Sequence, residues 1–207
     1  MFTDRRDAGR RLAARLSELA LQDPVVIGLP RGGVPVADEV ARLLEAPLDV
    51  IVVRKIGVPG HEELGMGAAA EDGVTVFNDD IRHAVALAPG AMDERVRAAH
   101  EQVRQRVAGI RATRPAIPLR GRAVVIVDDG VATGIDARAA CRCARARGAS
   151  RVILATPVAP AGWERRLTGE ADEFVAVVTD PDFAAVGQYY DDFGQTTDEE
   201  VLRCLAA

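Results

Sequence analysis

The sequence predicts an α/β fold: a five-stranded parallel sheet with helices on both faces, plus a small hood region. Runs of apolar, mostly β-branched residues such as 25–29 and 123–127 lack polar alternation, which is typical of strands buried on both faces. Segments with helical apolar spacing separate these runs, and this order favours parallel strands joined by helical crossovers.

The chain opens with an amphipathic helix, because Leu12, Leu16 and Leu19 share one face. The five core strands are expected at 25–29, 48–53, 74–78, 123–127 and 151–155, with a further strand at 174–178. Helices are expected at 4–21, 34–44, 80–88, 93–111, 137–147 and 163–167. A chain of 207 residues fits one domain, with its core at about 24–157 and the hood formed by 158–207 and the first helix.

Composition excludes several classes of function. The net charge of −5 argues against a general nucleic-acid-binding protein, which is expected to be basic. The first dozen residues are rich in Arg and Asp, and no apolar run is long enough to span a bilayer, so neither a secretory leader nor a membrane anchor is expected. Cys141, Cys143 and Cys204 give neither a disulfide framework nor a metal-binding spacing. These features predict a cytoplasmic protein without nucleic-acid or membrane partners.

The segment 123–136 carries the strongest chemical signal. An apolar strand ends in the acidic pair Asp128 and Asp129, and a loop with two glycines and Thr133 leads into a helix. Glycines expose backbone N–H groups, and a helix N-terminus adds partial positive charge, so this loop suits a phosphate. The acidic pair suits ribose hydroxyls or a hydrated magnesium ion, which prefers oxygen ligands. An ordinary strand and turn without a ligand is the alternative.

This segment resembles the PRPP-binding motif of the type I phosphoribosyltransferases over residues 124–134. The resemblance implies that Asp128 and Asp129 contact the ribose hydroxyls and Mg²⁺, the metal through water. It also implies that the loop holds the 5′-phosphate through Ala132, Thr133, Gly134, Ile135 and Asp136. The family places Thr where this chain has Asp136. Either Asp136 turns outward to cap the helix, or it repels the phosphate and lowers the affinity for PRPP.

A second strand–loop–helix unit contains Pro30-Arg31-Gly32-Gly33. By itself this sequence predicts a tight turn between a strand and a helix. In the family, the loop at this position binds the pyrophosphate of PRPP, often with an unusual peptide geometry. The resemblance therefore implies that Arg31 and Gly32 bind pyrophosphate, because an Arg fork suits a diphosphate and glycine exposes its N–H group.

Basic residues follow the strand at 48–53. Arg54 and Lys55 lie at its carboxyl end, where ligands of α/β proteins bind, and Lys55 is the only lysine among 26 Lys and Arg residues. We expect both to contact PRPP and Lys55 to take part in catalysis. The Gly-rich segment 56–71 has the composition of a long loop, and the resemblance implies a lid that closes over the reaction centre. His61 is expected to be an exposed loop residue.

The C-terminal region holds both tyrosines and Phe183. The family places base-binding groups in such a hood, including an aromatic ring that stacks on the base, and Phe183 is our candidate. Aromatic packing within a small lobe is the alternative for Tyr189, Tyr190 and Phe193.

Together these features imply a Mg²⁺-dependent enzyme that moves the 5-phosphoribosyl group from PRPP to a nucleobase-type nitrogen and releases pyrophosphate. The alternative is a non-catalytic protein of the same fold that senses PRPP or a nucleotide. A flavodoxin-like phosphate-binding module is a third interpretation, against which the acidic pair and the Gly-rich lid argue. The identity of the base stays open, as does a homodimer, which is frequent in the family.

Overall fold

The computed structural model describes residues 1–85 and 90–206, except for the side chains of residues 62 and 63. Its main sheet has five parallel strands in the order β2-β1-β6-β7-β8. These strands are β1 (Val25–Gly28), β2 (Leu48–Val50), β6 (Ala123–Val127), β7 (Arg151–Pro160) and β8 (Glu173–Asp180). The predicted five-stranded parallel sheet is confirmed.

The membership of that sheet differs from the prediction at one strand. The segment expected at 74–78 forms β5 (Thr75–Phe77), which pairs antiparallel with β4 in a separate three-stranded sheet. Its place in the parallel sheet is taken by β8, which pairs with β7. A short apolar run indicates a strand but does not say which neighbour it joins, and this explains the error.

The segment expected as a flexible lid at 56–71 is a β-hairpin. Strands β3 (Val53–Val58) and β4 (His61–Ala70) pair antiparallel, with irregular register around Gly57. Glycine allows close packing here as well as flexibility: a Cβ on Gly67 would lie 2.7 Å from the carbonyl oxygen of Val76 on β5. His61 is exposed, as expected, but it lies on a strand.

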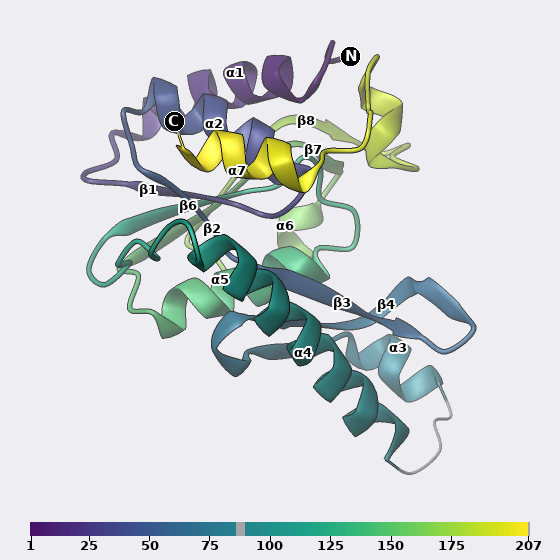
Figure 1. Ribbon diagram of the computed structural model, residues 1–207. Helices are drawn as coiled ribbons and strands as arrows, with labels where there is room; N and C mark the ends of the chain where they lie inside the picture. The colour runs from purple at the N-terminus through teal and green to yellow at the C-terminus, as the bar shows by residue number, and fades with distance from the viewer. Residues whose placement is uncertain (86–89, 207) are drawn as a thin grey trace.

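Helices cover both faces of the parallel sheet (Figure 1). On one face lie α1 (Arg5–Leu16), α2 (Gly33–Leu43) and α7 (Asp198–Ala206), and on the other lie α5 (Ile135–Ala146) and α6 (Trp163–Arg166). Neighbouring residues of β1 point to opposite faces, so Val26 packs with the α1–α2 cluster and Ile27 with the α5 cluster. No helix of the described chain is both long enough and apolar enough to cross a membrane.

The remaining helices surround the small sheet. Helix α4 (Ala91–Arg111) packs against β3 and β4, and α3 (Asp79–Ala84) precedes it. The helix expected at 80–88 therefore ends earlier, and residues 86–88 lie outside the described chain. The described residues also form short 3₁₀ turns, namely η1 (Ser17–Leu19), η2 (Glu71–Gly73) and η3 (Val186–Tyr189).

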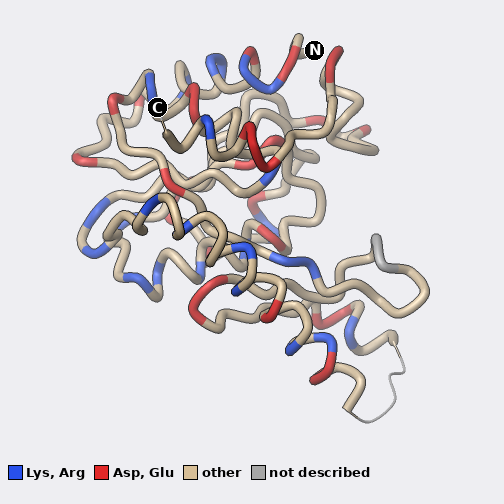
Figure 2. The backbone as a smooth tube through the Cα atoms, in the orientation of Figure 1, with Lys and Arg blue, Asp and Glu red and all other residues tan. Residues whose placement is uncertain are grey.

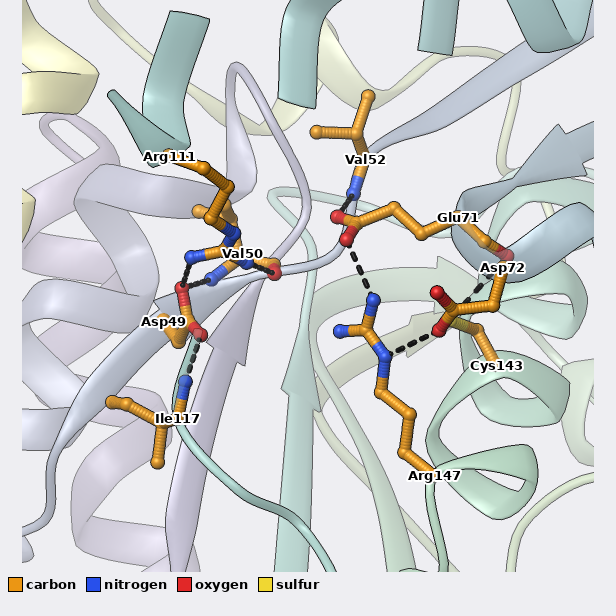
Figure 3. A network of polar contacts seen from close by, with 9 residues as sticks. All are labelled: Asp49, Val50, Val52, Glu71, Asp72, Arg111, Ile117, Cys143 and Arg147. Carbon is orange, nitrogen blue, oxygen red and sulfur yellow. Dashed lines mark hydrogen bonds and ion pairs between the residues drawn. The ribbon is translucent and has the colours of Figure 1, made fainter. Parts of the chain in front are cut away.

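A network of buried carboxylates joins the small sheet and α4 to the core (Figure 3). Asp49 of β2 accepts hydrogen bonds from Arg111 at the end of α4 (2.7 Å) and from the backbone N–H of Ile117 (2.9 Å). Glu71, at the end of the hairpin, accepts from the backbone N–H of Val52 (2.7 Å) and from Arg147, the residue that follows α5 (2.6 Å). These contacts tie the hairpin to the end of α5, and α4 to β2.

Candidate active site

The acidic pair lies at the carboxyl end of β6, as predicted. Asp128 Oδ1 accepts a hydrogen bond from the backbone N–H of Asp129 (2.9 Å). Burial raises the pKa of Asp128 well above its usual range, and the charges of Asp129 and Asp136 raise it further. Burial also raises the pKa of Asp129, although Arg5 opposes this rise. The charged forms of Asp128 and Asp129 are therefore disfavoured at this site, and a cation would stabilise them.

The acidic pair fits a hydrated magnesium ion. Among the described residues, no group of three or more His, Cys, Asp and Glu side chains could hold a metal ion. Asp128 and Asp129 can supply two carboxylates, so water and the substrate would have to supply most of the ligands. Mg²⁺ usually binds in this way, because it keeps several waters and takes one or two carboxylates together with substrate phosphates.

The glycine loop at 30–33 touches the acidic pair. The Pro30–Arg31 peptide bond is cis, which is an unusual peptide geometry of the kind that the resemblance implies. A Cβ placed on Gly32 would lie 2.0 Å from Asp129 Oδ2, and one on Gly33 would lie 2.9 Å from the Cα of Asp128. Only glycine allows this approach. The structure thus brings together two motifs that are almost 100 residues apart in the sequence.

The loop after the acidic pair leads into α5. Ala132 and Thr133 are exposed, and Gly134 adopts a positive φ of 79° at the N-terminus of the helix. Side-chain atoms of Leu167 would lie 3.1 Å from a Cβ on Gly134, so both space and conformation favour glycine at this position.

Asp136 does not turn outward. It is half-buried in the first turn of α5, and its Oδ1 atom is buried without a hydrogen-bond partner among the described residues. Burial raises the pKa of Asp136, while the positive charges of Lys55 and Arg54 oppose the rise. The first of the two predicted alternatives, an outward cap, is therefore wrong.

Lys55 and Arg54 approach this site from the hairpin. Both are exposed on β3, and Figure 2 shows a blue stretch on this strand. A Cβ on Gly65 of β4 would lie 3.1 Å from Lys55 Cδ and 3.5 Å from Ile135 Cγ2, so the stem of Lys55 lies near the start of α5. Cavities flank these groups: one of about 620 Å³ includes Arg31 and Arg54, and one of about 510 Å³ includes Thr133.

The C-terminal loop (residues 181–197) covers the acidic pair from the other side. Tyr190 donates a hydrogen bond from its hydroxyl to the backbone carbonyl oxygen of Asp129 (2.6 Å), and Val186 lies within 2.5 Å of a Cβ built on Gly130. Phe183 is half-buried and stacks on Tyr189 with ring centroids 5.7 Å apart. Its predicted contact with a base stays a prediction.

One site residue was not predicted. Arg5, the first residue of α1, donates from Nε to Asp129 Oδ2 (2.8 Å). The sequence gives no signal for this contact, because Arg5 is one of several arginines in a charged helix and lies 124 residues from its partner.

Comparison with known proteins identifies the family. The family model described as "Phosphoribosyl transferase domain" matches residues 3–193. The chain belongs to this family. The phosphoribosyl transferase domain therefore spans nearly the whole chain, and the predicted family is confirmed.

Relatives agree with this assignment. A Mycobacterium tuberculosis protein, present in strains CDC 1551 and H37Rv, is 53% identical over 205 residues. This relative is named as a phosphoribosyl transferase, but the name marks its activity as not established. This match covers 99% of the chain and 46% of the relative, so the chain spans about half the length of the curated relatives it matches.

Solved structures share the fold of this phosphoribosyl transferase domain. The crystal structure of TT1426 from Thermus thermophilus has a TM-score of 0.83 and 45% identity, and the match covers 99% of this chain and 97% of TT1426. A Neisseria gonorrhoeae protein with bound ppGpp matches 100% of this chain and 97% of its own, with a TM-score of 0.55. Its identity of 13% shows likeness of fold alone.

Proposed function

We propose that this domain transfers the 5-phosphoribosyl group from PRPP to a nitrogen of a nucleobase-like acceptor, releases pyrophosphate and depends on Mg²⁺. One observation carries the proposal: the loop at 30–33 and the acidic pair meet, with Gly32 directly against Asp129. A ligand that carries a diphosphate next to a ribose would span both motifs. PRPP has this chemistry, and its 5′-phosphate would reach the loop at 132–136.

The proposed reaction breaks the bond between C1 of the ribose and the pyrophosphate oxygen, and forms a bond between C1 and the acceptor nitrogen. The acceptor loses its N–H proton to solvent, and pyrophosphate leaves with the bonding electrons. Bound Mg²⁺, held through water by Asp128 and Asp129, would offset the negative charge that grows on pyrophosphate. Further positive charge for the proposed pyrophosphate would come from Arg31, Arg54 and Lys55. This supports roles for these residues in binding or catalysis.

The remaining assignments follow from the same ligand. Asp128 and Asp129 would also contact the ribose hydroxyls, Phe183 would stack on the base, and the 5′-phosphate would contact Ala132, Thr133, Gly134, Ile135 and Asp136. Cys141, Cys143 and Cys204 are free and buried, which supports a reducing compartment and hence a cytoplasmic location.

The first experiment is a calorimetric titration of PRPP with Mg²⁺ into the chain and into the double variant Asp128→Asn/Asp129→Asn. We expect the chain to bind PRPP and the double variant to lose this binding. A screen of purine and pyrimidine bases then measures pyrophosphate release. The absence of PRPP binding to the unaltered chain would contradict the proposed function.

Sensing of PRPP or a nucleotide without turnover is the second candidate, and Asp136 favours it. A carboxylate at the phosphate loop, where the family has Thr, is a departure that a sensing protein can tolerate more easily than an enzyme. PRPP binding without pyrophosphate release, for every base tested, would support sensing. Because one structural relative carries bound ppGpp, that nucleotide belongs among the ligands titrated.

A further inference from the structure

Arg5 is held in one place by contacts with three parts of the chain. Its Nε donates to Asp129 Oδ2 (2.8 Å), and its Nη1 donates to the backbone carbonyl oxygen of Gly194 (2.6 Å). The guanidinium carbon lies 4.0 Å from the centre of the Phe193 ring. Only 13% of the Arg5 side chain and 15% of the Asp129 side chain are exposed. This ion pair is therefore largely buried.

The start of α1 is positioned for this contact by the chain on both sides of it. Asp4 caps the helix by accepting a hydrogen bond from the backbone N–H of Asp7 (2.7 Å). Before the helix, Phe2 exchanges backbone hydrogen bonds with Tyr189 and Asp191 of the C-terminal loop. Figure 1 shows the N-terminus beside this loop, which leads from β8 towards α7. Arg5 is therefore directed towards the acidic pair by the fold itself.

The position of Arg5 relative to the glycine loop points to a ligand. A Cβ built on Gly32 would lie 3.2 Å from Arg5 Nε as well as 2.0 Å from Asp129 Oδ2. The guanidinium thus lies at the loop where the proposed pyrophosphate would bind. Among the hydrogen bonds of the described residues, Arg5 uses Nε and Nη1 but not Nη2. It can therefore donate to a ligand while it keeps both present contacts.

We propose that Arg5 is a pyrophosphate-binding residue of this site, which contacts the diphosphate on the loop at 30–33 and also positions Asp129. This inference rests on the proposed function and adds a residue from outside both sequence motifs. A guanidinium matches a diphosphate because it presents several N–H donors in one plane.

Inorganic pyrophosphate with Mg²⁺ is the direct probe, measured by calorimetric titration. Arg5→Gln removes the charge, Arg5→Lys keeps a charge but loses the planar fork, and Arg10→Gln is the control. Arg10 lies on the same helix, and 57% of its side chain is exposed. We expect Arg5→Gln to weaken pyrophosphate binding by at least about tenfold, or about 1.4 kcal/mol, and Arg5→Lys to weaken it less. Arg10→Gln leaves it unchanged.

Ribose 5-phosphate separates ligand binding from a loss of structure. We expect Arg5→Gln to weaken ribose 5-phosphate binding less than pyrophosphate binding, because Arg5 acts on ribose 5-phosphate only through Asp129 at the ribose hydroxyls, while the phosphate group reaches the loop at 132–136. If Arg5→Gln does not fold, pyrophosphate and ribose 5-phosphate binding are compared in Arg5→Lys instead, because this variant retains a positive charge beside Asp129.

Two results overturn the inference, and they differ from failure of the proposed function. Pyrophosphate binding by Arg5→Gln that equals or exceeds that of the unaltered chain would show that Arg5 is a tether. An equal loss of pyrophosphate and ribose 5-phosphate binding would assign Arg5 a structural role. If the unaltered chain binds neither pyrophosphate nor PRPP, the proposed function fails and the inference fails with it.

Discussion

Gly32→Ala tests the contact that joins the two motifs of the site. The added methyl group would lie 2.0 Å from Asp129 Oδ2 and 2.7 Å from its Cγ, whereas real Cβ atoms essentially never approach closer than 3.0 Å. The carboxylate or the loop must therefore move by about 1 Å, which breaks the hydrogen bond with Arg5 or strains the loop. Loss of this charge-assisted bond and local overpacking together cost about 2–3 kcal/mol.

Urea unfolding and thermal unfolding measure this loss. In a chain of this size, about 2–3 kcal/mol corresponds to a fall in Tm of about 4–12 °C. We also expect at least a tenfold loss of PRPP affinity (about 1.4 kcal/mol), because Asp129 is displaced and the glycine loop is altered.

Gly109→Ala is the matched control for this substitution. Gly109 lies inside α4 with no atom within 4 Å of its Cβ position, so the same change there should stabilise the helix by about 0.5–1 kcal/mol. The contact between the two motifs is refuted if the free energy of unfolding of Gly32→Ala lies within about 0.5 kcal/mol of that of the unaltered chain and the variant binds PRPP equally well.

Three further predictions concern single carboxylates. Asp136→Thr should raise PRPP affinity, by up to about tenfold, because it removes a negative charge from the phosphate loop; unchanged or weaker binding in a calorimetric titration contradicts this repulsion. Burial raises the pKa of Asp136, so its contribution to folding is favourable at low pH and is lost as the pH rises through the folded pKa. Asp136→Asn should therefore raise Tm more at about pH 7.5 than at about pH 4.5, and an equal gain at both pH values argues against this titration. Glu71→Ala should destabilise the chain by about 2–3 kcal/mol in urea unfolding, because it leaves the backbone N–H of Val52 without its partner and removes one of the two carboxylates that pair with Arg147. Glu101→Ala removes an exposed ion pair and should leave stability nearly unchanged; similar losses for both variants would mean that burial of Glu71 is unimportant.

The two sequence motifs were enough to locate the site, because each motif lies within one short segment of the chain. An uninterrupted apolar strand, followed by a glycine loop and a helix, occurs at both 25–43 and 123–146, and the structure contains both units. Carboxyl ends of parallel strands meet at one edge of a sheet, so the contact between Gly32 and Asp129 follows from the class of fold.

The errors concern long-range pairing. Residues 56–71 have the composition of a loop, yet β3 and β4 form a hairpin because their glycines pack against neighbouring strands. Similarly, β5 and β8 are both short strands, and the sheet that each joins depends on partners far away in the sequence. No local pattern contains that information.

The sequence by itself determined the family, the α/β class, the two glycine loops and the acidic pair. These depend on the order of residue types within short segments, where strand burial, turn conformation and helix starts are local properties. Only the tertiary structure decided that Asp136 faces inward, that the lid is a hairpin and that Arg5 pairs with Asp129. Those features depend on which distant segments meet, and that is settled by packing of the whole chain.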